Sequence, residues 1–193
     1  RKEAVMKDKD RIDKTVKTLT PELKELSRKI HDNPEVGLEE FKALMWQTEL
    51  IKKHGFDVEE NYCGMPTAYR AVYKGKKTGP KIALISEYDA LPGIGHACGH
   101  CVSGAISVLA GIAASKLQDA LDADIDVIGT PVEETDGAKC ALIKKGVFDH
   151  YDMAMMIHLY DQNLIYCTLN GLASYLYTFH GKAAHASAAP WDG

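Results

Sequence analysis

The sequence predicts an α/β fold in which a mixed, largely parallel sheet is flanked by helices. Three observations support this prediction. Two helical segments precede the first strand-like run, and short apolar runs then alternate with segments of helical periodicity. At 193 residues, the chain is also long enough to bury a core without help from disulfides or metals.

The first half of the chain should contain two helices followed by two strands. A helix is expected to begin at Thr20-Pro21, because threonine caps helices and proline is tolerated at the first helical position. A second helix fits residues 38–54 and should end at Gly55. Apolar runs at residues 67–74 and 81–87 predict strands, and the GKKTG segment between them predicts a hairpin.

The second half should alternate between helices and strands. Helices are expected at about residues 102–116 and 138–145, and strands at residues 125–129 and 153–158. In sheets of this kind, ligands bind beyond the carboxyl ends of the parallel strands.

The pattern changes near residue 170. The alternating residues 175–180 predict a half-buried strand that belongs to a different element. We therefore expect one domain over residues 1–169 and the beginning of a second domain over residues 170–193.

Composition argues against several classes of protein. The net charge is −4, and basic residues are scattered among acidic ones, so no continuous basic face would bind nucleic acid. No apolar run approaches the roughly 20 residues that span a bilayer, and the charged first 14 residues do not resemble a signal peptide. We expect a soluble, cytoplasmic protein that binds neither nucleic acid nor membrane.

The cysteines are odd in number and unevenly spaced. Without an export signal, such cysteines are expected to be free, buried or bound to metal, and a disulfide framework is not expected. They are Cys63, Cys98, Cys101, Cys140 and Cys167.

The stretch GHACGHC, residues 95–101, allows two interpretations. Cys98 and His100 are two residues apart, so both side chains can face one ion, and a thiolate with an imidazole suits Zn²⁺. Cys98 and Cys101 also form a C-x-x-C pair before a predicted helix, which is the arrangement of thiol-disulfide oxidoreductases. The redox interpretation leaves the downstream carboxylates and histidine unexplained.

Chemically capable residues follow three of the predicted strands. Asp89 comes soon after the second strand, Glu133-Glu134 follow the third, and His158 ends the fourth. Adjacent glutamates usually lie on a solvated surface, and a histidine at a strand end usually belongs to the core. If these groups converge, one glutamate can bind a cation while the other takes a proton from water.

Five segments together resemble a known family. They are NPEVGLEEF at residues 33–41, SEYDALPGIGHACGH at 86–100, GTPVEE at 129–134, MIH at 156–158 and GKAAHASAAP at 181–190. These segments are similar to the dinuclear metallopeptidases related to aminoacylase and carboxypeptidase G. They are most similar to the amidohydrolase branch, which includes hippurate hydrolase, indole-acetyl amino acid hydrolases and aminobenzoyl-glutamate hydrolase.

The resemblance implies a zinc-exopeptidase-like catalytic domain that holds two divalent metal ions, zinc or manganese, with cobalt or nickel as alternatives. The implied ligands are Cys98, His100, Glu134 and His158, with Cys98 bridging. Glu133 would be the general base that deprotonates the activated water and then protonates the leaving amine. Asp89 would orient a ligand. His185 would stabilise the oxyanion from a smaller α+β lid domain, through which the protein would form a homodimer.

The implied activity is metal-dependent hydrolysis of the amide bond of N-acyl amino acids or small dipeptides. Two departures stand out. Position 101 is usually Asn or Asp in this branch, whereas this chain has Cys101. The family also continues for about as many residues again and supplies a final histidine ligand there, so the 193-residue piece alone is expected to be inactive. A thiol-disulfide oxidoreductase and an inactive binding homologue are the alternatives.

Overall fold

A five-stranded mixed sheet forms the centre of the fold, with the strand order β1-β2-β4-β3-β5. Its strands are β1 (Asp57–Glu60), β2 (Tyr69–Tyr73), β3 (Lys81–Ser86), β4 (Asp124–Gly129) and β5 (Met153–Met155). β2 is antiparallel to both of its neighbours, and β3 is parallel to β4 and to β5. Four of the five strands therefore point the same way, which confirms the predicted α/β fold with a mixed, largely parallel sheet.

The computed structural model describes residues 2–76, 79–166, 168, 171, 173 and 175–193, so Cys167 lies outside the described residues. The chain divides into two units, Arg1–Tyr160 and Asp161–Gly193. The sheet and the longer helices belong to the first unit. No helix in the described residues is both long enough and apolar enough to span a bilayer.

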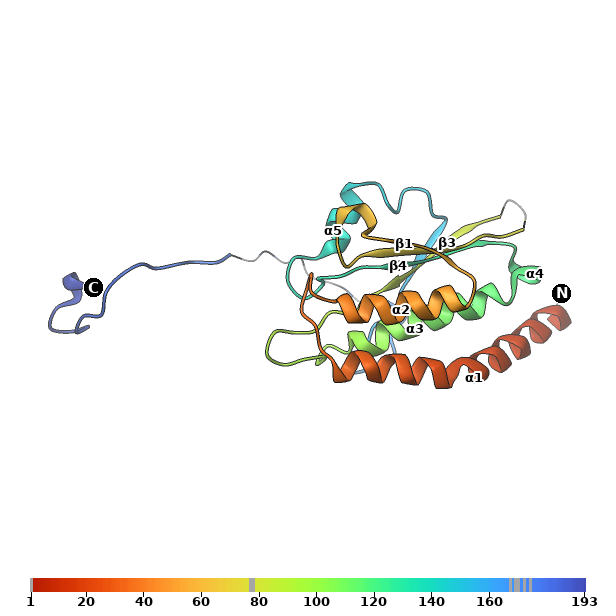
Figure 1. Cartoon of the computed structure of the whole chain (residues 1–193), viewed down its shortest axis with the longest axis horizontal. Coiled ribbons are helices and arrows are strands. Elements are labelled where there is room, and N and C mark those ends of the chain that lie inside the picture. Colours follow the sequence, from red (N-terminus) through yellow and green to blue (C-terminus); the bar gives the residue numbers. More distant parts are fainter. Residues whose placement is uncertain (1, 77–78, 167, 169–170, 172, 174) are drawn as a thin grey trace. The chain divides into compact units, whose positions relative to one another are not determined.

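Three helices cover one face of the sheet (Figure 1). They are α1 (Lys2–Asp32), α2 (Phe41–Lys53) and α3 (His100–Ser115). Ile30 of α1, Ile51 of α2 and Val108 of α3 pack with Val127 of β4 in one buried cluster. Burying these apolar side chains stabilises the layer by about 1.5–3 kcal/mol for each side chain.

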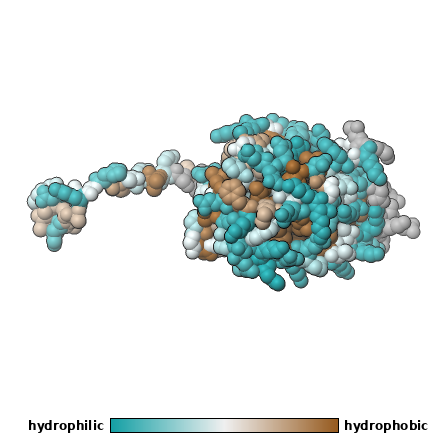
Figure 2. Space-filling view, in the orientation of Figure 1, coloured by the Kyte–Doolittle hydropathy of each residue, from teal (hydrophilic) through white to brown (hydrophobic). Residues whose placement is uncertain are grey.

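The opposite face of the sheet packs against α5 (Ala138–Lys144). Leu142 of α5 contacts a second cluster that contains Ala83 of β3 and Ile128 of β4. Because neighbouring strand residues point to opposite faces, Val127 and Ile128 serve the two different clusters. Two 3₁₀ turns, η1 (Tyr62–Gly64) and η2 (Pro190–Asp192), and the short helix α4 (Gln118–Leu121) complete the described elements. Hydrophilic residues cover most of the face of the first unit that is visible in Figure 2.

The predicted hairpin between β2 and β3 is wrong. β4 lies between these two strands and pairs with β2 on one side and with β3 on the other. The last five residues of β4 are buried. A strand that is apolar on both faces is most stable in the middle of a sheet, so it separates two strands that are neighbours in sequence.

The predicted start of the first helix at Thr20 is also wrong, because α1 runs through Pro21 without a break. Thr20 Oγ1 donates a hydrogen bond to the Val16 carbonyl, 2.7 Å away, and does not cap a helix. Proline removes one hydrogen bond from a helix interior. Leu19 and Leu26, on either side of it, are both buried in the core, and this packing stabilises the continuous helix.

Two further boundaries differ from the prediction. β5 ends at Met155, so His158 follows the strand and is not part of it. Residues 175–180 form no strand, and Tyr175 and Tyr177 are largely exposed. A strand needs a partner for its backbone groups, and the structure shows none for this segment among the described residues.

We expect Gly104→Ala to destabilise the protein. A Cβ atom at Gly104 would clash with the Glu87 carbonyl oxygen, a backbone atom that cannot rotate away. Glycine to alanine within a helix usually stabilises by about 0.4–1 kcal/mol, whereas overpacking costs about 1–3 kcal/mol. Urea unfolding should therefore show a net loss for Gly104→Ala, and a gain would contradict this packing. Gly111→Ala meets a Val127 methyl group instead and should cost less.

Candidate metal centre

The candidate site lies where β3, β4 and β5 end. Glu87 and Asp89 follow β3, Glu133 and Glu134 follow β4, and His158 follows β5. The three strands run parallel, so their carboxyl ends lie at one edge of the sheet. The loop before α3 adds Cys98, and the first residue of α3 adds the donor described next.

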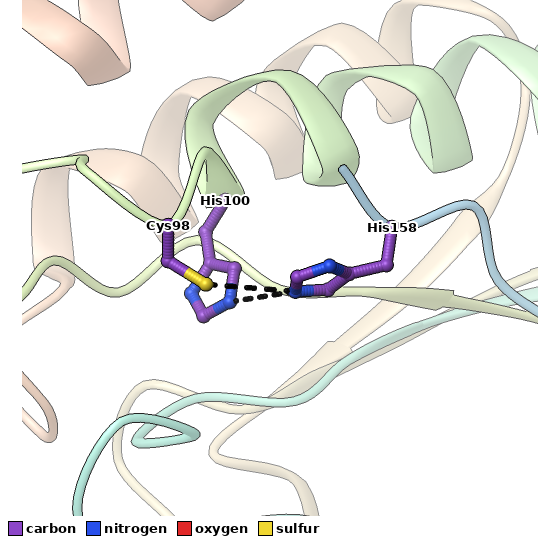
Figure 3. A group of neighbouring side chains, drawn as sticks. All are labelled: Cys98, His100 and His158. Carbon is purple, nitrogen blue, oxygen red and sulfur yellow. Dashed lines mark hydrogen bonds between the residues drawn. The ribbon is translucent and has the colours of Figure 1, made fainter. Parts of the chain in front are cut away.

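Three side chains from distant parts of the sequence point toward one another (Figure 3). His158 Nε2 lies 3.3 Å from His100 Nε2 and 3.7 Å from Cys98 Sγ. Ser103 of α3 donates a hydrogen bond to the Ile157 carbonyl at 2.8 Å, which holds the segment before His158 against the helix. One donor atom from each of the three residues lies within 4.8 Å of the other two, a spacing that suits a shared metal ion.

A second group of possible ligands shares His100. It combines His100 with Glu87 and Glu133, and the donor atoms again lie within 4.8 Å of one another. Glu133 Oε2 is 3.7 Å from His100 Nε2, and Glu134 Oε1 is 3.8 Å from His100 Nδ1. The Glu133 side chain is 35% exposed and that of Glu134 is 13% exposed, so Glu133 is the more accessible of the pair.

Asp89 orients two parts of the site. Its Oδ1 is 3.0 Å from His100 Nδ1, and its Oδ2 accepts the Glu134 backbone N–H at 2.9 Å. A carboxylate beside one ring nitrogen fixes the histidine tautomer and directs the other nitrogen toward a ligand. In this structure the directed atom is His100 Nε2, which faces Cys98 and His158.

The electrostatics of the cluster follow from burial and from its many carboxylates. Burial would raise the pKa of Asp89, but hydrogen bonds from His100 and the Glu134 N–H outweigh it, and the pKa is lowered. Burial alone would lower the pKa of His100, yet Asp89 and the charge of Glu87 raise it. Burial, followed by the Glu134 charge, raises the pKa of the Cys98 thiol to about 12. Excess negative charge therefore surrounds the thiol.

The loop that carries Glu133 and Glu134 is held by a buried carboxylate. Glu40 is fully buried, and its two oxygens accept hydrogen bonds from Thr67 Oγ1 at 2.7 Å and from the Val132 N–H at 2.8 Å. Val132 has φ of 52°, which is strained for a β-branched residue. A Cβ atom at Gly37 would lie 2.5 Å from the Val132 side chain, so this fit requires glycine.

Three other candidates from the sequence lie outside the cluster. His185 belongs to the second unit, where its Nδ1 accepts the Ala188 N–H at 3.1 Å. His96 is half-buried, and both of its ring nitrogens are buried without a hydrogen-bond partner among the described residues. Cys101 is buried and 3% exposed, in the first turn of α3.

The structure adds two residues that had no predicted role. Glu87 is buried in the cluster, and Lys139 of α5 donates a hydrogen bond to its Oε1. The available signal for Glu87 was its position, two residues before Asp89 at the end of a strand. Lys139 carried no signal, since one lysine in an amphipathic helix is usually a surface residue.

The residues present fit bound divalent cations. The donor set combines a thiolate, imidazoles and carboxylates, which suits Zn²⁺ and also Mn²⁺ or Co²⁺. Among the described residues, two buried carboxylate oxygens of the cluster, Glu87 Oε2 and Glu134 Oε1, accept no hydrogen bond. A buried charged group without a partner is costly, and a cation between these oxygens and the imidazoles would remove that cost.

The fold and the donor set together define a metal-binding α/β protein with the layout of a metallohydrolase. Residues 83–168 match the model of peptidase family M20/M25/M40, and this range contains nearly all of the cluster. The chain belongs to this family, which confirms the resemblance found in the sequence.

Two relatives and one solved structure illustrate the similarity. The Xaa-Arg dipeptidase of Mus musculus is 35% identical over 183 residues, which cover 87% of this chain and 42% of that protein. A p-aminobenzoyl-glutamate hydrolase polypeptide of Escherichia coli is 30% identical over 191 residues, covering 86% and 38%. A dinuclear metal-binding M20 peptidase of Bacillus subtilis superposes with a TM-score of 0.65 at 23% identity, covering 72% and 42%. The chain spans less than half the length of each of these proteins.

We expect Glu40→Gln to change the pH dependence of stability. Burial raises the pKa of Glu40 above its ordinary value of 4.5, so the folded state keeps a proton that the unfolded state has released. The stability contributed by this group is complete below pH 4.5 and is lost as the pH rises through the raised pKa. Glutamine does not titrate, so the variant should gain stability relative to the wild type as the pH rises.

Urea unfolding at acidic and at neutral pH would measure this difference. Thr48→Ser, at a buried and uncharged position of α2, serves as the control and should change stability equally at both pH values. An offset between Glu40→Gln and the wild type that does not change with pH would contradict the prediction.

Proposed function

We propose that the protein is a metal-dependent amidohydrolase that cleaves the amide bond of N-acyl amino acids or small dipeptides. The observation that carries this proposal is the convergence of Cys98, His100 and His158 beside Glu133. Three donors of metal-ligand type meet a partly exposed carboxylate that can accept a proton from water.

Two lines of comparison support the substrate class. The relatives include an Xaa-Arg dipeptidase and a p-aminobenzoyl-glutamate hydrolase. A dipeptide and p-aminobenzoyl-glutamate both contain an amide bond whose nitrogen belongs to an amino acid. Hydrolysis at that bond would give a carboxylic acid and a free amino acid.

We assign Cys98, His100, Glu134 and His158 as metal ligands, with Cys98 shared between two ions. Four carboxylates gather here, those of Glu87, Asp89, Glu133 and Glu134, while Lys139 donates to one of them. This excess of negative charge supports two divalent ions, with zinc or manganese as the first candidates. Bound ions would polarise the scissile carbonyl and lower the pKa of water.

Glu133 is the proposed general base. Its accessible carboxylate takes a proton from water as the oxygen attacks the carbonyl carbon of the amide. The same carboxylate then delivers that proton to the amide nitrogen as the carbon–nitrogen bond breaks, so the amine leaves in neutral form. Asp89 keeps His100 and the Glu134 backbone in place during both steps.

His185 is the proposed stabiliser of the oxyanion. Its Nδ1 accepts the backbone N–H groups of Ser187 and Ala188, so in the neutral ring the proton resides on Nε2. An Nε2–H group is a suitable donor to a developing oxyanion. We further propose that residues 170–193 begin a lid domain, that this domain forms a homodimer, and that the enzyme is cytoplasmic.

The observed thiol environment disfavours the alternative of a thiol-disulfide oxidoreductase. A reactive thiol needs a lowered pKa. The pKa of Cys98 is instead raised to about 12 by burial and by Glu134, and burial also raises the pKa of Cys101. An inactive binding homologue would be recognised by elemental analysis that finds fewer than two bound metal ions per chain.

In a catalytically active form of the enzyme, Glu133→Gln should lower kcat by a factor of about 10²–10⁴ while metal content stays the same. The reason is that glutamine cannot accept the proton but preserves the shape of the side chain. Hydrolysis of N-acyl amino acids and metal analysis of the same sample would measure both quantities. Loss of metal together with activity would instead make Glu133 a ligand.

Cys101→Asn should leave amide hydrolysis intact, because Cys101 is buried in α3 and has no proposed role in the reaction. An oxidoreductase that uses Cys98 and Cys101 would lose all activity in this variant. Assays of amide hydrolysis and of disulfide reduction on the same preparation distinguish the two functions. Loss of hydrolysis in a folded variant would count against the proposed function.

A further inference from the structure

Glu87 occupies a position in the cluster that the proposed reaction does not use. It directly follows β3 and is 1% exposed. Its Oε2 atom lies 3.5 Å from His100 Nε2 and 3.6 Å from His158 Nε2. These are the two ring nitrogens that face each other in Figure 3.

The other Glu87 oxygen already has a partner. Lys139 Nζ, from the first turn of α5, donates to Oε1. Oε2 is buried and accepts no hydrogen bond from any described residue. The lysine thus neutralises part of the charge and fixes the carboxylate so that its unused oxygen faces the histidines.

The histidines cannot fill this gap when their rings are neutral. His100 Nδ1 lies 3.1 Å from the Asp89 carbonyl, and His158 Nδ1 lies 2.7 Å from the Leu159 carbonyl. A carbonyl oxygen only accepts, so in the neutral rings the proton resides on Nδ1 and each Nε2 carries a lone pair. Three electron-pair donors, Glu87 Oε2 and the two Nε2 atoms, therefore face one another with no proton between them.

The spacing of these atoms matches a coordination shell. They are 3.3, 3.5 and 3.6 Å apart, too far for good hydrogen bonds. Ligands that lie about 2.0–2.2 Å from an ion at tetrahedral angles are about 3.3–3.6 Å from one another. We propose that Glu87 is a further ligand of the metal centre and donates Oε2 to the ion held by His100 and His158.

This inference rests on the proposed function, because it requires that the cluster bind metal. It also carries a consequence for metal choice. Carboxylate oxygens suit Mn²⁺, whereas a shell of thiolate and imidazole suits Zn²⁺. A ligating Glu87 should therefore contribute more to the affinity for Mn²⁺ than to the affinity for Zn²⁺.

Two variants separate ligation from charge. Glu87→Gln keeps the length of the side chain but removes its charge. Glu87→Asp keeps the charge but withdraws the oxygen by one methylene group, beyond reach of the ion. Because a ligand needs both properties, each variant should weaken Mn²⁺ binding by about tenfold or more.

The measurement is a titration of chelator-treated protein with Mn²⁺ and, separately, with Zn²⁺, in competition with a chelating dye. Asp126→Asn is the matched control, since Asp126 is a carboxylate that is 1% exposed on β4 but pairs with Arg70. Its loss should lower the melting temperature and leave both metal affinities unchanged. The Co²⁺ absorption spectrum of each protein gives a second readout, in which the visible bands should change with Glu87 while the thiolate band persists.

The possible outcomes distinguish the two proposals. If the wild type binds neither ion, the proposed function fails. If the wild type binds metal and Glu87→Asp binds Mn²⁺ equally well, Glu87 acts only through its charge and this inference alone is overturned. It is likewise overturned if both variants lower the melting temperature of the metal-free protein but keep wild-type metal affinity.

Discussion

The site depends on the parallel pairing of β3 with β4 and with β5. Parallel strands in register bring their carboxyl ends to one edge, so residues that follow three strands far apart in sequence meet within a few ångströms. The apolar residues of β4 maintain this alignment, because they are buried on both faces of the sheet. The hydrophobic core thus sets the distance between the donor atoms.

The same alignment concentrates unfavourable charge. Four carboxylates and a thiol lie around two imidazoles, and two of the buried oxygens have no hydrogen-bond partner among the described residues. Such a cluster costs folding free energy unless cations neutralise it. The apolar packing on both sides of the sheet offsets this cost, so the protein can hold a group of ligands that would repel one another in isolation.

A single segment, residues 33–41, connects the two loops that carry the acidic residues. The Glu35 carbonyl accepts the Ala90 N–H at 2.8 Å, next to Asp89, and the Glu35 carboxylate accepts two N–H groups at the start of α2. Glu40 holds Val132 directly before Glu133. The strained backbone at Val132 persists because these surrounding contacts determine its conformation. This segment contains no proposed ligand, yet it positions ligands from two loops.

The sequence by itself determined the fold class, the positions of α2, α3 and α5, the family and the set of residues that meet at the cluster. These features depend on periodicity, on helix ends and on short spacings such as Cys98 to His100, all of which are local. Only the tertiary structure decided that β4 separates β2 from β3 and that α1 continues through Pro21, because burial over long distances outweighed the local signals of a turn and a proline. It also decided the place of Glu87. An oxygen without a partner is recognised only when every neighbour is in position, and those neighbours come from α3, α5 and the segment after β5.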